Sequence, residues 1–256
     1  MRTDILDLHR FYQSPLGAKA SAFIASRLNE VWGEAKQMRI GGFGFTGPYL
    51  DAFPNAERRL NFAPAGQGVI RWPPSAPGDG ARPNCASLVQ EGYWPLPDAS
   101  LDRVLIVHGL EETSNPRRLM REVWRVLSPE GKVVIVAAHR RGLWSSFDMS
   151  PFAAGRPYSN RQLRELLQEA TFNVVQHTGA LFFPPVNSPF LLRAARYWER
   201  AGGRVWSGLS GVLMVEASKN LEAPVGKVIA QPVRIQRRAG VRPVSAPGGS
   251  APRKIQ

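Results

Sequence analysis

The sequence predicts an α/β protein built on a parallel sheet. Residues 101–108 form a short apolar run rich in β-branched residues, which is typical of a buried strand. Asn115 is a suitable N-cap, and Pro116 can begin a helix because its missing N–H costs nothing at that position. Gly131 ends the helical pattern, and a second apolar strand follows over 132–138. A strand, a helix and a strand in succession form a right-handed βαβ unit, which pairs its strands in parallel.

The residues before this unit predict two helices and three strands. Residues 4–12 place their apolar side chains on one face of a short helix. Ser14 and Pro15 begin a second helix, which residues 18–32 fill. Three further apolar segments are interpreted as strands, over 38–44, 58–62 and 84–90.

The residues after the unit continue the alternation of helices and strands. Ser159 caps a helix over 160–170, and Pro189 opens another that runs from 188 to 200. Short apolar segments on either side predict strands over 172–177 and 211–217. The chain contains no internal repeat.

Two segments of the central unit carry a family resemblance. Residues 94–102 read WPLPDASLD, and residues 122–131 read EVWRVLSPEG. An L-P-F-P-D-x-S-F-D segment, a strand and an E-x-x-R-V-L-x-P-G-G segment follow one another in class I S-adenosylmethionine (SAM) dependent methyltransferases. This chain resembles that class, and within it the type 11 methyltransferase-domain group. The resemblance extends more weakly from Met38 to Lys219.

The resemblance implies the whole architecture. It predicts a Rossmann-like sheet of seven mostly parallel strands, with helices on both faces and an antiparallel last strand. Residues 1–37 would form helices that cover the cofactor cleft, although plain packing against the sheet is the alternative. Residues 38–219 would form the methyltransferase-like domain, followed by a basic tail over 220–256. The implied cofactor is SAM.

The resemblance also places cofactor-binding residues at neighbouring strand ends. The glycine-rich turn after 38–44 would lie under the methionyl group, Gln67 near the ribose, residues 90–92 against the adenine, and His108 in the cleft wall. The predicted cofactor-binding residues are Gly42, Gly44, Thr46, Gly47, Gln67, Gln90, Glu91, Gly92 and His108. An ordinary turn at the glycines and an ordinary polar loop at 90–92 are the alternatives.

Two features depart from the family pattern. Gly42 stands where the family has an acid, and Thr46 replaces a glycine. No acid occurs between Arg58 and Gly78, although relatives present an Asp or Glu to the ribose there. A charge-assisted hydrogen bond is about twice as strong as a neutral one. The missing acid therefore predicts weaker cofactor binding, with the Gln67 amide as a substitute.

Basic and aromatic residues follow the strand over 132–138. Such a mixture at the mouth of a cleft suits an anionic or aromatic substrate, and a basic surface loop is the alternative. The predicted substrate residues are Arg140, Arg141, Trp144, Arg156 and Tyr158.

His108 and His139 are the candidate bases for an acceptor that must lose a proton. Each follows a predicted strand at its carboxyl end, where open α/β sheets bind ligands. His108 has two other interpretations, a wall of the cleft and a core residue. Glu111 or Glu112 could orient its ring.

The charge is concentrated near the end of the chain. The net charge is +13, and residues 219–256 contain eight Lys and Arg but one acid, among many Pro and Gly. Such a composition cannot offset chain entropy by burying apolar surface, so the tail is predicted to be disordered and solubilising. An RNA-binding arm is the alternative.

Other classes of protein are not indicated. Cys85 is the single cysteine, which excludes an internal disulfide framework and a thiolate cluster, and the four histidines have no metal-ligand spacing. No apolar run is long enough for a membrane span, and the first residues do not resemble a secretory signal. We therefore expect a cytoplasmic protein without a metal.

The sequence predicts a SAM-dependent methyltransferase that acts on a small molecule by in-line displacement. A catalytically inactive binding module with the same fold is the alternative, favoured by the missing ribose acid and the irregular glycine turn. RNA methylation is a third hypothesis, which depends on the charge.

Overall fold

The computed structural model describes residues 2–74, 82–147, 150–205 and 207–221. The predicted basic tail, 220–256, lies outside the described residues from 222 onward.

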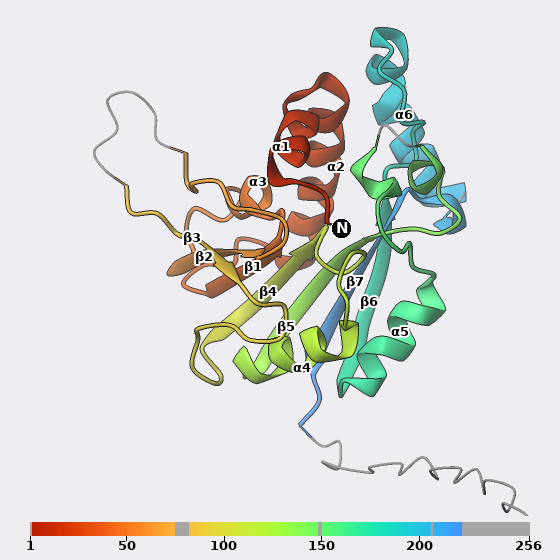
Figure 1. Ribbon diagram of the computed structural model, residues 1–256. Helices are drawn as coiled ribbons and strands as arrows, with labels where there is room; N and C mark the ends of the chain where they lie inside the picture. Colours follow the sequence, from red (N-terminus) through yellow and green to blue (C-terminus); the bar gives the residue numbers. More distant parts are fainter. Residues whose placement is uncertain (1, 75–81, 148–149, 206, 222–256) are drawn as a thin grey trace, which may run out of the picture. The chain divides into compact units, whose positions relative to one another are not determined.

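Within the described residues, seven strands form one sheet in the order β3-β2-β1-β4-β5-β7-β6 (Figure 1). The strand bounds are β1 Arg39–Gly44, β2 Arg58–Pro64, β3 Ala86–Val89, β4 Leu101–Val107, β5 Leu127–Ala138, β6 Phe172–Ala180 and β7 Val212–Lys219. Neighbouring strands from β3 to β5 are parallel, and β7 is antiparallel to both β5 and β6. The predicted seven-stranded, mostly parallel sheet with an antiparallel last strand is confirmed.

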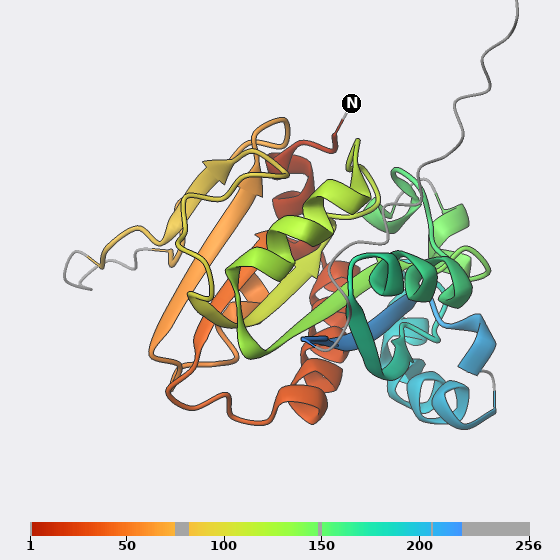
Figure 2. The ribbon, with the colours of Figure 1, turned by 90° about the horizontal axis from the view of Figure 1, so that it is seen from below.

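Helices cover both faces of the sheet (Figure 2). Their bounds are α1 Ile5–Gln13, α2 Pro15–Trp32, α3 Gly47–Leu50, α4 Pro116–Val126, α5 Asn160–Glu169 and α6 Pro189–Val205, with 3₁₀ turns η1 Leu143–Ser146, η2 Pro151–Ala153 and η3 Ser207–Leu209. One buried cluster joins the sheet to α1, α2, α3 and α6, and a second joins its other face to α4 and α5. Burial of these two apolar layers is the main stabilising term.

Polar caps fix where the helices begin. Ser14 and Asn115 each accept a hydrogen bond from the backbone N–H three residues further on. Ser159 forms a reciprocal capping box with Gln162 at the start of α5. These caps satisfy N–H groups that have no partner within the helix, so the starts predicted from the sequence are the ones observed.

The glycine-rich turn leads into α3, which is a single helical turn. Two details after α4 differ from the sequence-based expectations. After α4, Leu127 is already extended and pairs with Leu101, so β5 begins before the predicted strand. Gly131 lacks the positive φ expected of a helix stop. An ideal Cβ there would lie 2.8 Å from the Ser128 carbonyl oxygen, so close packing is what requires a glycine.

The E-x-x-R motif holds the connection between β3 and β4. The buried Glu122 carboxylate accepts the Trp94 N–H at 2.6 Å and the Arg125 guanidinium at 2.6 Å. Arg125 also donates to the carbonyls of Trp94 and Leu96. The Trp94 ring stacks on Phe43 of β1, with the ring centres 5.3 Å apart. The motif that carries the family resemblance therefore anchors a loop to α4 and to the core.

Candidate functional site

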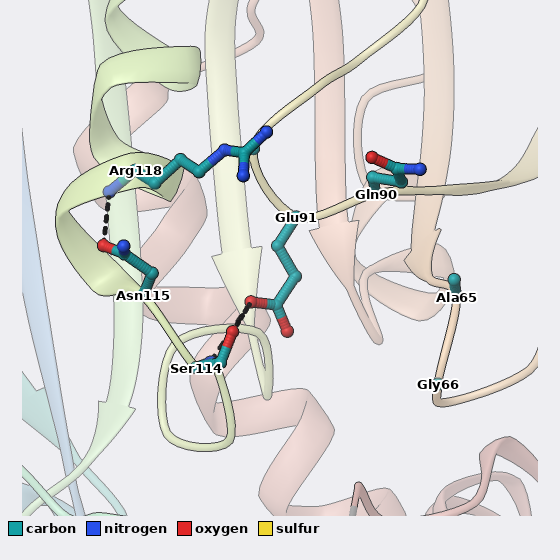
Figure 3. Close-up of a pocket in the computed structure, with 8 residues that line it drawn as sticks. Ala65, Gly66, Gln90, Glu91, Ser114, Asn115 and Arg118 are labelled. Carbon is teal, nitrogen blue, oxygen red and sulfur yellow. Dashed lines mark hydrogen bonds between the residues drawn. The ribbon is translucent and has the colours of Figure 1, made fainter.

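The carboxyl ends of β2 and β3 and the segment leading into α4 surround a hollow of about 400 Å³ (Figure 3). Its lining residues are Ala65, Gly66, Gln90, Glu91, Gly92, Ser114, Asn115 and Arg118. Arg118 reaches from α4 toward the 90–92 segment and packs so closely on Gly92 that a Cβ there would lie 2.4 Å from its Cγ. The structure thus brings the predicted residues Gln90, Glu91 and Gly92 together at a place where open α/β sheets bind ligands.

Glu91 is the acidic side chain of this hollow. Its Oε2 accepts hydrogen bonds from the Thr113 hydroxyl and, at 3.2 Å, from the Ser114 N–H. Its Oε1 accepts two N–H groups of Arg2, at 2.6 and 3.0 Å. Burial by itself would raise the pKa of Glu91, but the hydrogen bonds from Thr113 and Arg2 outweigh burial and lower it. The carboxylate is therefore ionised and already held by partners within the chain.

Gln67 follows the end of β2 next to Gly66. Its side chain is buried, and neither its amide nitrogen nor its amide oxygen has a hydrogen-bond partner among the described residues. A buried amide without partners is costly. Gln67 follows the lining residue Gly66 but is not itself among the residues that line the hollow.

The predicted glycine turn after β1 is packed against the neighbouring strand. Gly44 has a φ of +95°, and a Cβ there would lie 2.1 Å from the Val107 carbonyl oxygen. Thr46 is buried and donates a hydrogen bond to Asn61 at 2.8 Å, and a Cβ on Gly42 would collide with its hydroxyl. A Cβ on Gly47 would lie 2.9 Å from the Trp72 ring. These small residues are required by close packing within the protein.

Helix α1 lies over this turn. The Tyr12 ring stacks on Phe45, with the ring centres 4.9 Å apart. The Tyr12 hydroxyl forms a 2.8 Å hydrogen bond with Nε2 of His108 and accepts one from Tyr49 at 3.0 Å. Burial lowers the pKa of His108 to about 3, so the ring is neutral and Nε2 can accept from Tyr12. The aromatic side chains of Tyr12 and Phe45 therefore cover one side of the turn. A hollow of about 190 Å³ remains beside the turn, and the predicted residues Gly44 and Gly47 help to line it.

The residues before α1 cross the ends of β3 and β4. Arg2 donates to Glu91 and to the carbonyl of Gly109, and the Thr3 backbone and hydroxyl donate to Glu112. These contacts join the start of the chain to residues about one hundred positions away, which no local pattern in the sequence could indicate.

Glu111 is a buried acid that the sequence suggested merely as a possible partner for His108. Its Oε1 accepts the Ala138 N–H at 2.8 Å, and its Oε2 has no partner among the described residues. Burial raises the pKa of Glu111 to about 7. Its bond to Ala138 and the bond of Glu112 to Thr3 show that Tyr12, rather than either acid, orients His108. The sequence signal that could have identified Glu111 as a functional candidate is its position as an acid shortly after a central strand.

The predicted substrate residues do not surround one cavity. Trp144 is buried and donates its indole N–H to the Phe183 carbonyl at 2.8 Å. Arg140, Arg141 and Arg156 are exposed, while the half-buried Tyr158 lines a separate hollow between α4 and α5.

His139, the second candidate base, is buried at the end of β5. Its Nδ1 lies 2.9 Å from the Ser210 carbonyl oxygen, and burial lowers its pKa. This contact gives Nδ1 of the His139 ring a hydrogen-bond partner within the fold.

A second hollow, of about 390 Å³, lies between α1 and η2. It is lined by Thr3, Asp7, Phe11, Ser150, Pro151, Ala153 and Ala154. Sequence reasoning did not find it, because it depends on how α1 is placed against the loop after β5.

Comparison with known proteins gives the fold a family context. The family model described as a methyltransferase domain, type 11, matches residues 79–135, which include both segments of the predicted resemblance. A comparison with curated proteins found no match.

Solved structures share the fold at low sequence identity. A SAM-dependent methyltransferase from Mesorhizobium loti has a TM-score of 0.52 at 14% identity, covering 76% of this chain and 96% of that one. A possible histamine N-methyltransferase from Thermotoga maritima has a TM-score of 0.51 at 17% identity, covering 83% and 92%. Together with the matched segment, they confirm the predicted resemblance to class I methyltransferases at the level of the fold.

Helices that could cross a membrane are not found among the described residues.

Proposed function

We propose that this protein, whose fold is that of class I methyltransferases, is a SAM-dependent methyltransferase for a small acceptor. One observation carries the proposal. The ends of β2 and β3 and the start of α4 surround a hollow lined with amide, hydroxyl and carboxylate groups, in the position where this fold binds a nucleoside. The matched methyltransferase-domain segment contributes part of the wall, from Gln90 to Arg118.

The residues of the hollow fit the nucleoside half of SAM. Gln90 and Asn115 offer donors and acceptors for a base edge, and Gly66 leaves room because it has no side chain. The neighbouring Gln67 has an unpartnered amide and does not line the hollow, so its side chain would have to turn toward the ribose hydroxyls when the cofactor binds. We therefore propose that Gln67 replaces the acid that relatives place after this strand.

The methionyl half requires α1 to move. Tyr12 and Phe45 cover one side of the glycine turn, and Arg2 bridges Glu91 and Gly109. We propose that the start of the chain is a cover that moves away from the strand ends when the cofactor binds. When bound, SAM would supply a methyl group on a sulfonium sulfur, and the chain would supply alignment and exclusion of water.

The acceptor site in this proposal is the hollow between α1 and η2. Phe11 and Pro151 provide apolar contacts, and Asp7 provides an acidic one. Its Thr3 also binds Glu112, which follows the buried Glu111 in the sequence. We propose that Glu111 accepts the acceptor's proton at Oε2, since burial places its pKa near 7. His108 is held by Tyr12 and remains neutral.

Titration with S-adenosylhomocysteine tests the cofactor site. A Leu at position 66 would fill the hollow without strain, because Gly66 lacks a positive φ and its ideal Cβ meets nothing closer than the Arg2 Cδ at 3.8 Å. We expect wild type to release heat on binding and Gly66→Leu to bind at least tenfold more weakly. Gly208→Leu, at a position where a Cβ meets nothing within 4 Å, should bind like wild type. Equal binding by both variants, or none by wild type at millimolar ligand, would reject the proposed site.

A non-catalytic nucleoside-binding module is the second candidate function. The aromatic packing of Tyr12 on Phe45 favours it, because it leaves the nucleoside hollow open while covering one side of the proposed methionyl position. Adenosine distinguishes the two functions. A module of this kind should bind adenosine as tightly as S-adenosylhomocysteine, whereas a methyltransferase should prefer the ligand with the amino-acid portion.

A further inference from the structure

Helix α6 has one face fixed to the protein. Leu192 and Ala195 are buried in the cluster that α6 shares with α1 and α2. The buried Glu199 carboxylate accepts the backbone N–H groups of Leu181 and Phe182, at 2.9 and 2.8 Å. The helix therefore cannot rotate without breaking two charge-assisted hydrogen bonds, and its outer face keeps a fixed orientation.

The outer face combines aromatic and basic side chains. The Phe190 side chain is 77% exposed, that of Tyr197 73% and that of Trp198 39%. Helical spacing places the exposed Arg193 and Arg200 beside Phe190 and Tyr197. The exposed Arg196 and Trp198 lie on the two opposite flanks of this face. Large apolar side chains are seldom this exposed without a binding role when they gather on one face.

The charge of this face has a single sign. Glu199 is the sole acid in the sequence from 186 to 209, and its carboxylate points inward. Val186 and Leu209, which precede and follow the helix in the sequence, are also exposed. Figure 1 shows α6 at the edge of the described fold, beside α2.

We propose that the outer face of α6 binds the surface of an anionic lipid bilayer. Phe190, Tyr197 and Trp198 would enter the headgroup region, and the three arginines would contact lipid phosphates. The inference is independent of the proposed methyl transfer.

The chemistry of the face favours lipid over other anionic partners. Aromatic side chains with a polar edge are enriched at the level of the lipid headgroups of a bilayer. Arginine forms bidentate hydrogen bonds with phosphate. Exposed aliphatic residues such as Val186 and Leu209 are stabilised when they are buried at the boundary between the headgroups and the acyl chains of a bilayer. Nucleic acid offers them no stacking surface. Basic residues near a bilayer surface bind anionic lipids and lose affinity as salt rises.

Vesicle flotation of the full chain tests this proposal. We expect wild type to float with vesicles of phosphatidylcholine and phosphatidylglycerol and to remain in solution with phosphatidylcholine alone. Phe190→Ala/Tyr197→Ala should lower the partition coefficient on anionic vesicles at least tenfold, and so should Arg193→Ala/Arg196→Ala. Because all four side chains are exposed, the variants should keep the thermal unfolding temperature of wild type, which circular dichroism checks.

The matched control is Leu88→Ala/Tyr93→Ala, which removes two exposed apolar side chains near β3 and should bind like wild type. Undiminished flotation of both α6 variants would show that another basic part of the chain drives binding and would overturn the proposal. Loss of affinity for a single-stranded RNA in the Phe190→Ala/Tyr197→Ala variant, without loss of flotation, would assign the face to nucleic acid instead. A wild-type dimer that this variant dissociates, again without loss of flotation, would assign the face to self-association.

Discussion

Glu111 and His108 are buried ionisable side chains beside the end of β4, and burial shifts their pKa values in opposite directions. The pKa of the Glu111 carboxyl rises from 4.5 to about 7, and that of the His108 ring falls from 6.5 to about 3. Both shifts favour the neutral form in the folded chain. Both side chains therefore remain mostly uncharged between about pH 4 and pH 7 in the folded state.

The Glu111 shift predicts a dependence of stability on pH. As pH rises from 4.5 to 7, the unfolded chain loses this proton before the folded chain does, so the free energy of unfolding falls by about 3 kcal/mol. His108 has the opposite effect, because stability is lost as pH falls below 6.5. We therefore expect the Glu111 contribution to appear in the difference in the free energy of unfolding between wild type and Glu111→Gln, since His108 is common to both. Urea denaturation should show wild type losing about 3 kcal/mol relative to this variant between about pH 4.5 and pH 8.

A constant difference across that range would show that Glu111 is solvated in the folded protein. The same variant separates stability from activity, since loss of proton acceptance should lower kcat in a methyl-transfer assay while leaving S-adenosylhomocysteine affinity unchanged.

At the scale of elements, the proposed function makes α1 and the residues before it the cover that controls access to the proposed cofactor site. Arg2 is held by Glu91 and Gly109, and its guanidinium would have to leave them when the cover opens. Opening therefore subtracts from cofactor affinity, because an apparent affinity falls with the fraction of the protein that is competent to bind.

We expect Arg2→Ala to bind S-adenosylhomocysteine more tightly than wild type. Loss of a charged hydrogen bond of about 1.5 kcal/mol from the closed state corresponds to about tenfold in apparent affinity. Calorimetric titration measures the change. Arg10→Ala is the control, because Arg10 forms an exposed pair with Asp7 on the same helix and should leave affinity unchanged. An affinity equal to wild type or lower in Arg2→Ala would show that α1 does not restrict access.

The elements themselves were largely predictable, whereas their contacts were not. The cap at Asn115 and the apolar residues of β4 are local signals, so the central βαβ unit was predicted nearly to its ends. The one-turn α3 was not, because Tyr49 and Leu50 are buried at once against α1 and α2, a tertiary effect. Burial also determines the two features of the candidate site that the sequence could not predict. The unpartnered Gln67 amide and the shifted Glu111 pKa depend on neighbours that the sequence does not place together.

At the scale of the whole molecule, the sheet should be unequal in stability from centre to edge. β4 and β5 have a hydrogen-bonded neighbour on each side and buried faces, whereas the short β3 is paired to β2 alone. Amide hydrogen exchange should therefore be slowest at Leu105 and Ile106 and much faster at Ser87 and Leu88. Mass spectrometry of exchanged fragments measures this order. Equal protection in β3 and β4 would mean that the described sheet opens as a single unit.

The position of β7 affects how the sheet can form during synthesis. β7 is the last described strand in the chain, yet it lies between β5 and β6 and is the neighbour that joins them. While the ribosome has not yet released residues 212–219, β5 and β6 have no strand between them, and the nascent chain presents their unpaired edges. Completion of the fold thus waits for the translation of a segment far from the proposed cofactor site, and a chain that stops before it would be a substrate for chaperones or proteases.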